Sequence, residues 1–166
     1  VQPRGVLLFN LNNDPYNPEF TANIGNVYTH DCYANAEYLY TCDLGNGVAI
    51  YDIKDKTNPV FLNRFQTSSS FTHNAWTSND GQYLYTTDER SGAYVDVYDV
   101  SDPTSVRFIN KYRNKDSELG KVIPHNTYQV GNWAVTSWYT DGILIKDMTR
   151  PDNIVKVGEY DTFYDE

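Results

Sequence analysis

Residues 47–52 read GVAIYD, and three further stretches repeat this pattern: GVLLFN at 5–10, YVDVYD at 94–99 and GILIKD at 142–147. The last positions of the four stretches are 10, 52, 99 and 147, so the steps between them are 42, 47 and 48 residues. A repeat of roughly 40 to 50 residues is typical of one four-stranded blade of a β-propeller. The stretch at 47–52 therefore predicts the fold of the whole chain, because every repeat contains its counterpart.

Each repeat contains further segments with the pattern of strands. After each marker stretch, a turn rich in Asp, Asn and Pro leads to an outer segment with alternating apolar and polar residues, at 19–24, 60–65, 106–112 and 154–160. Three marker stretches are preceded by a hairpin that begins at a histidine: HDCYANAEYLYTCD from residue 30, HNAWTSNDGQYLYTTD from 73 and HNTYQVGNWAVTSW from 125. One repeat is therefore four consecutive antiparallel strands.

We predict an all-β chain, residues 1–166, that forms one partial β-propeller domain of four-stranded antiparallel blades. Blades around an axis bury the faces that a single small sheet leaves exposed. Stacked β-solenoid coils are the competing architecture, but they are usually shorter than this repeat. At about 45 residues per blade the chain holds about 3.7 blades, in units at 1–26 (partial), 27–67, 68–113 and 120–162. Because propeller rings normally close with roughly four to eight blades, we expect part of a larger ring or an assembly of copies.

As a set, these motifs resemble those of a known repeat family. The GVxIYDIxDxxNPxxL unit from residue 47, HNAW with DGxYLYTTDE from 73, and PHNTY with SWYTDGILIKD from 124 are similar to the LVIVD-repeat propellers. The similarity is greatest to the choice-of-anchor-B type of Bacteroidetes and related bacteria, over about residues 5–162. The resemblance implies a propeller that is secreted or displayed at the cell surface, often on a longer chain, and it implies no established reaction.

The charge of the chain excludes some partners. Asp and Glu number 22 against 13 Lys and Arg, which gives a net charge of -9. Charge of this sign repels phosphate backbones, and the basic residues are scattered singly. No apolar run approaches the roughly 18 to 20 residues that cross a bilayer. We therefore expect no nucleic-acid partner and no membrane-spanning segment.

All three histidines of the chain, His30, His73 and His125, occupy the same position of the repeat. In a propeller the strand that begins at each histidine is expected to be the innermost strand of its blade. The three imidazoles should then converge around the central channel on one face. This periodicity makes them the leading candidates for binding a ligand or a metal.

Carboxylates are expected beside these imidazoles, because the second strand of each hairpin runs back antiparallel to its start. We place Asp43 near His30, Asp88 or Glu89 near His73, and Asp141 nearest His125. Neutral imidazoles with nearby carboxylates suit zinc, copper or iron. Two interpretations stay open: a divalent metal or polar ligand with His30, His73 and His125 as metal ligands, or an architectural contact between each histidine and the backbone of the neighbouring blade.

The turn aspartates are candidate calcium ligands, and the two cysteines are a candidate disulfide. The turn aspartates Asp14, Asp55, Asp102 and Asp152 could bind calcium, but Asx turns explain them more simply. Alignment of the hairpins places Cys42 opposite Thr29, with the thiols of Cys32 and Cys42 on opposite faces. Export would permit a disulfide, but this register predicts two free, core-packed cysteines.

The function that these features favour is an interaction or scaffolding module, secreted or displayed at a bacterial cell surface, with its ligand face at the histidine end of the channel. Aromatic rings near that face could stack on a sugar or a peptide. The expected partners are a protein, a glycan or copies of the chain. The candidate ligand-binding residues are His30, His73, His125, Asp43, Asp88, Trp76 and Tyr139.

Two other functions fit these residues. One is a metal-dependent oxidase or hydrolase that uses the three histidines. No nucleophile elbow, phosphate loop or HExxH helix accompanies them, so this hypothesis depends on the histidines alone. The other is a subunit of a surface fibre or coat, in which the next copy completes the incomplete blades.

Overall fold

The computed structural model describes residues 4–114 and 122–162, which form strands joined by turns and short linkers. Two boundaries of the predicted blade units, residues 1 and 120, lie outside the described residues. Within the two described ranges, no helix is long and apolar enough to span a membrane.

Fourteen described strands form four antiparallel sheets. The first sheet has two strands, β1 (Val6–Asn10) and β2 (Glu19–Ile24). The other three sheets have four strands each. They are β3 (Asp31–Ala34), β4 (Tyr38–Cys42), β5 (Val48–Asp52) and β6 (Val60–Phe65); β7 (Thr72–Thr77), β8 (Tyr83–Asp88), β9 (Val95–Asp99) and β10 (Arg107–Tyr112); and β11 (Pro124–Val130), β12 (Trp133–Trp138), β13 (Gly142–Asp147) and β14 (Val155–Tyr160).

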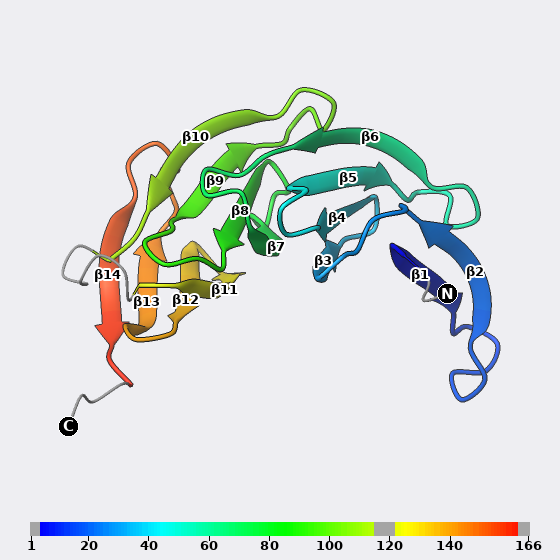
Figure 1. Ribbon diagram of the computed structural model, residues 1–166, viewed down its shortest axis with the longest axis horizontal. Helices are drawn as coiled ribbons and strands as arrows, with labels where there is room; N and C mark the ends of the chain where they lie inside the picture. The colour runs from blue at the N-terminus through cyan, green and yellow to red at the C-terminus, as the bar shows by residue number, and fades with distance from the viewer. Residues whose placement is uncertain (1–3, 115–121, 163–166) are drawn as a thin grey trace.

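The sheets have the radial order of a propeller. In each four-stranded sheet the strands pair in the order of the chain. Figure 1 shows the sheets side by side along an arc, with β3, β7 and β11 on its concave side and β2, β6, β10 and β14 along its convex side. On the concave side β7 contacts both β3 and β11. The predicted all-β, partial β-propeller is therefore confirmed.

Apolar side chains from neighbouring sheets form three clusters, one at each junction between sheets. Ile50 of β5 and Leu84 of β8 belong to the cluster between the second and third sheets. Val97 of β9 and Leu144 of β13 belong to the next cluster, and Ile24 of β2 packs with β4 and β5. The strands β5 and β9 are buried on both faces because each lies between two other sheets. The marker stretches are thus the centre of each blade.

A glycine opens three of the four marker stretches, where a neighbouring segment of backbone passes too close for a side chain. Gly47 has a φ of 76°, and a Cβ at this position would lie 2.1 Å from the carbonyl oxygen of Phe65. Gly142 repeats the arrangement, with a φ of 69° and the carbonyl oxygen of Tyr160 at 2.2 Å. Positive φ and this close approach both require glycine.

The two cysteines are free, as predicted, but their register was predicted wrongly. Cys42 is buried opposite Asp31, not Thr29, and Cys32 is exposed opposite Thr41. The thiols still point to opposite faces of the sheet. Cys42 shares a face with its partner Asp31, and Cys32, the next residue after Asp31 along the strand, points to the other face. Cys32 is therefore not part of the core. The register differs by two residues because a short turn joins β3 to β4.

Asx turns end several marker strands and order the turns that follow. The backbone N–H of Thr104 donates to Asp102 Oδ1 at 2.9 Å, and that of Thr57 donates to Asp55 Oδ1 at 2.9 Å. These bonds and those from the threonine hydroxyls hold the pKa of both carboxyls below the usual value. A similar bond reaches Asp14, whereas Asp152 pairs with an arginine. Asx turns therefore account for Asp14, Asp55 and Asp102, as the sequence predicts.

The Asx turns predict that the free energy of unfolding falls as the pH is lowered below about 4. In the folded protein the pKa of Asp55 and Asp102 is lower than the ordinary 3.8, so the unfolded chain binds more protons in acid. This stabilisation is present above the ordinary pKa and is lost as the pH falls. Urea denaturation at pH 6 and pH 3 measures the loss. Asp102→Asn keeps an Asx acceptor but does not titrate, so its loss should be smaller; a loss equal to or larger than that of the wild type would contradict this account.

Candidate functional site

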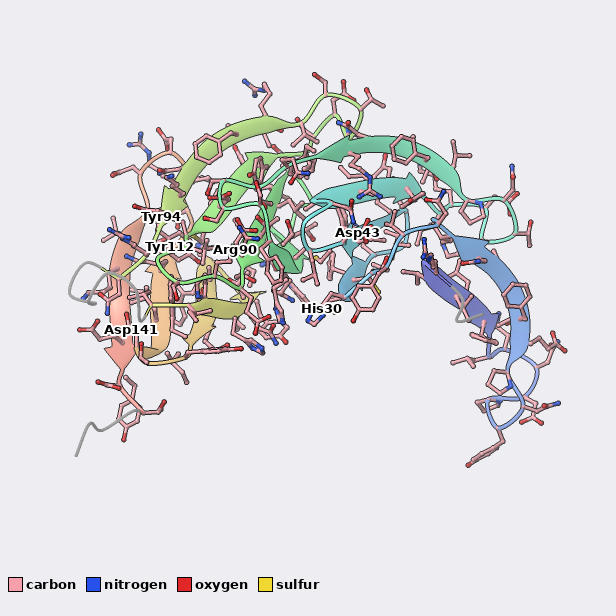
Figure 2. The ribbon with its side chains drawn as sticks, in the orientation of Figure 1. His30, Asp43, Arg90, Tyr94, Tyr112 and Asp141 are labelled. Atoms are coloured by element: carbon pink, nitrogen blue, oxygen red, sulfur yellow. The ribbon has the colours of Figure 1, made fainter. Side chains whose placement is uncertain are left out.

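The three histidines meet on the concave side of the arc. His30 directly precedes β3, His73 lies in β7 and His125 lies in β11, and these are the innermost strands of their sheets. The ring centroids of His30 and His73 are 4.5 Å apart, and those of His73 and His125 are 4.4 Å apart. Figure 2 shows His30 on this side of the arc. The three imidazoles therefore lie next to one another on one side of the arc, as the repeat predicts.

A backbone carbonyl of the neighbouring sheet orients the ring of His73, the middle one of the three imidazoles. His73 Nδ1 lies 3.0 Å from the carbonyl oxygen of His125. Since a carbonyl only accepts, Nδ1 carries the proton and Nε2 of the neutral ring is an acceptor. Burial lowers the pKa of His73, and this effect is larger than the opposing effect of Glu89. The ring is therefore neutral at neutral pH, and its bond to the next sheet is the predicted architectural contact.

Glu89 faces two of the three imidazoles. Its Oε2 lies 3.6 Å from Nε2 of His73, and its Oε1 lies 4.0 Å from Nε2 of His125. The hydroxyl of Tyr139 donates to Glu89 Oε1, and the ring of Tyr139 lies 5.5 Å from that of His125. We call His30, His73, Glu89, His125 and Tyr139 the histidine cluster.

Of the carboxylates predicted beside the histidines, Glu89 is the one that contacts two of them. Asp43 accepts a hydrogen bond from Thr29 Oγ1 at 2.8 Å and forms an ion pair with Arg64 at 2.7 Å. Asp88 accepts a hydrogen bond from the backbone N–H of Ser69 at 2.7 Å. Thr29 and Ser69 belong to the linkers that lead into β3 and β7. Both aspartates therefore hold linkers between sheets, a role that the sequence analysis missed.

The carboxylate beside His125 was predicted wrongly. We expected Asp141, which follows β12 in the same sheet, whereas the contact is made by Glu89 of the preceding sheet. The antiparallel argument considered only neighbours within one hairpin. In the arc, the inner ends of two sheets lie so close that a side chain from one sheet reaches the histidine of the next.

Trp76 lies apart from the histidine cluster, contrary to the expectation that it flanks the same face. Its ring contacts those of Tyr33 and Tyr128, with centroids 4.5 and 4.9 Å away. Tyr33 and Trp76 border a hollow of about 550 Å³ that Asn79 and Gln129 also line. Trp76 follows His73 by three positions, which is about 10 Å along a strand. Tyr139, in contrast, joins the cluster as predicted.

Asn74, which the sequence analysis did not single out, connects the three innermost strands. Its Nδ2 donates to Asp31 Oδ2 at 3.0 Å, and its Oδ1 accepts the backbone N–H of Thr127 at 3.0 Å. Asn74 is buried, so these bonds replace its contacts with water. Each histidine is followed by an Asp or Asn, namely Asp31, Asn74 or Asn126. That recurrence was the available signal.

Comparison with known proteins agrees with this architecture. A model of the LVIVD repeat matches residues 28–67 and 78–114. The fold is similar to that of the β-propeller domain of Cps50 (Swd1) from Myceliophteria thermophila, with a TM-score of 0.63 and 15% identity over 82% of this chain and 40% of that one. It is also similar to a chain of a nidogen/laminin complex, with a TM-score of 0.55 and 11% identity over 84% of this chain and 50% of that one.

These comparisons concern the fold alone. The chain spans half or less of the length of the two solved chains described above. No curated protein matches the sequence. The function must therefore be argued from the histidine cluster and from the surfaces around it.

Asn74→Ala should lower the free energy of unfolding by about 1 to 3 kcal/mol, because it removes the partner of the buried N–H of Thr127 and a bond to the half-buried carboxylate of Asp31. Urea denaturation measures the change. The matched control is Asn126→Ala, at the same position of the next repeat; its Oδ1 is buried and has no partner among the described residues. The control should cost less than about 1 kcal/mol. Equal losses would show that Asn74 does not connect the strands.

Proposed function

We propose that this partial LVIVD-repeat β-propeller is an interaction module, and that the histidine cluster is its ligand face. The repeat and the propeller fold support an interaction or scaffolding role in general. The resemblance to the choice-of-anchor-B type supports a place outside the cell or at the surface of a bacterium. The single observation that carries the ligand face is the convergence of equivalent residues from three sheets.

The aromatic rings of the histidine cluster form a row that Tyr28, next to His30, extends at one end. Tyr28, His30, His73, His125 and Tyr139 follow one another with centroid separations of 4.4 to 6.4 Å. The two ends of the row reach solvent, since Tyr28 is 64% exposed and Tyr139 is 51% exposed. Tyrosines with an apolar ring and a polar hydroxyl are favoured at binding surfaces.

The chemistry of this row suits a protein or glycan partner. The exposed ring faces can stack on a sugar or on a peptide side chain, while imidazole nitrogens and hydroxyls bond to polar groups of the partner. The net charge of -9 disfavours an anionic partner such as nucleic acid. We therefore propose a neutral or basic protein segment, or a glycan, as the ligand.

Tyr139→Ala should weaken binding at least about tenfold, because it removes a ring face at one end of the row. The purified chain is tested on a glycan array and a peptide array, and the affinity for the strongest binder is then measured by calorimetry. Tyr160→Ala is the matched control, since Tyr160 is 65% exposed on β14, outside the histidine cluster.

The control should retain its affinity within about twofold. Two results would contradict the proposed ligand face. One is the absence of saturable binding to either array, and the other is an equal loss of affinity in both variants.

A second candidate, a subunit of a surface fibre or coat, is favoured by the outer face of the fourth sheet. One face of this sheet packs in an apolar cluster against the third sheet. On the other face Val130, Trp133 and Ile143 are exposed. The buried Oδ1 of Asn126 has no partner among the described residues, although Asn74 uses the same atom to bind the neighbouring sheet. The first sheet of a second copy, which exposes Phe20, could cover this face.

Copies joined in this way would form a head-to-tail ring or filament. Light scattering between about 1 and 100 μM should then show a mass that rises with concentration. Trp133→Glu should reduce the assembly to a monomer, because Trp133 is 52% exposed and its substitution places a charge on the apolar face. A wild-type chain that stays monomeric throughout this range would exclude the candidate.

A further inference from the structure

One ligand atom from each of His30, His73 and Glu89 lies within 4.8 Å of the other two. In a tetrahedral zinc site, ligand atoms at about 2.0 to 2.1 Å from the metal are about 3.3 Å apart. His73 Nε2 and Glu89 Oε2, at 3.6 Å, are close to this separation. His30 is exposed and Glu89 is half-buried, so both side chains have room to rotate toward a common ion.

We propose that His30, His73 and Glu89 bind one divalent first-row transition metal ion, for which zinc is the reference. This ligand set differs from the three histidines expected from the repeat, because Glu89 takes the place of His125. Two imidazoles and one carboxylate are ligands that zinc accepts, and they leave a fourth position for water or for a group of a bound partner. Calcium prefers six to eight oxygen ligands and does not suit this set.

The contacts of His73 add a geometric argument for a cation. Its Nδ1 lies 3.0 Å from the carbonyl oxygen of His125, which leaves Nε2 directed at Oε2 of Glu89 at 3.6 Å. An unprotonated imidazole nitrogen and a carboxylate oxygen at this separation can both bind one metal ion.

Two of the proposed ligands also make the supporting hydrogen bonds that are typical of metal sites. A metal-bound imidazole commonly donates its other N–H to a backbone carbonyl, which fixes the tautomer. His73 makes this bond to His125. A ligating carboxylate is commonly hydrogen-bonded in turn, and Tyr139 donates to Glu89. The site is therefore oriented by residues that do not bind the ion.

The site lies within the proposed ligand face, but uptake of the ion is measured without any partner. The chain is first treated with a chelator, and zinc is then titrated against a chromophoric competitor at pH 7.5. We expect one equivalent of zinc per chain. His30→Ala and Glu89→Gln should each weaken zinc binding at least about tenfold. Far-UV circular dichroism checks that both variants fold.

Glu159→Gln is the matched control for Glu89→Gln, because Glu159 lies in β14, outside the histidine cluster, and pairs with Lys156. It should retain the zinc affinity within about threefold, and Tyr139→Phe should weaken the affinity by less than the ligand variants.

Less than a tenth of an equivalent bound to the wild type would overturn the metal site. Zinc binding that both His30→Ala and Glu89→Gln leave unchanged would also overturn it, since the ion would then lie elsewhere. Either result leaves the array experiment intact, so failure of the metal site and failure of the ligand face are distinguishable.

Discussion

Asn74 is buried between two other innermost strands and hydrogen-bonds to both of them. These bonds, with the contact from His73 to the backbone of His125, set the spacing of β3, β7 and β11. Because the inner strands lie this close, the sheets must diverge outward, and their facing sides close over apolar clusters. The same spacing brings the imidazole of His73 within 4.5 Å of those of His30 and His125. The architecture and the candidate site thus depend on the same contacts.

The sequence predicted strands well wherever one face is buried and the residues alternate. The expected outer strands at 19–24 and 60–65 coincide with β2 (Glu19–Ile24) and β6 (Val60–Phe65). The repeat length of roughly 40 to 50 residues also indicated the radial order, because it is typical of one propeller blade. The register of Cys42 was not predictable in this way, because it depends on the length of one turn and a shift by two residues preserves the alternation of faces.

The site could be predicted only as far as the repeat determines it. Equivalent positions of the repeat lie on equivalent strands, so the meeting of His30, His73 and His125 followed from their spacing. The partner of these imidazoles did not follow, because Glu89 reaches His125 across the junction between two sheets. Trp76 was misplaced although its spacing from His73 carried the signal, because three positions along a strand cover about 10 Å. Contacts between sheets, unlike those within a hairpin, need the three-dimensional arrangement.

The central claim is that the innermost strands converge and stack the three imidazoles. Proton NMR of the purified chain at about pH 8, where imidazoles are neutral, tests it most directly. The account predicts nuclear Overhauser contacts from the ring protons of His73 to those of both His30 and His125. It also predicts that nitrogen-15 shifts place the proton of His73 on Nδ1. Absence of both ring contacts, with His73 in the other tautomer, would contradict the convergence on which the proposed ligand face and the metal site are built.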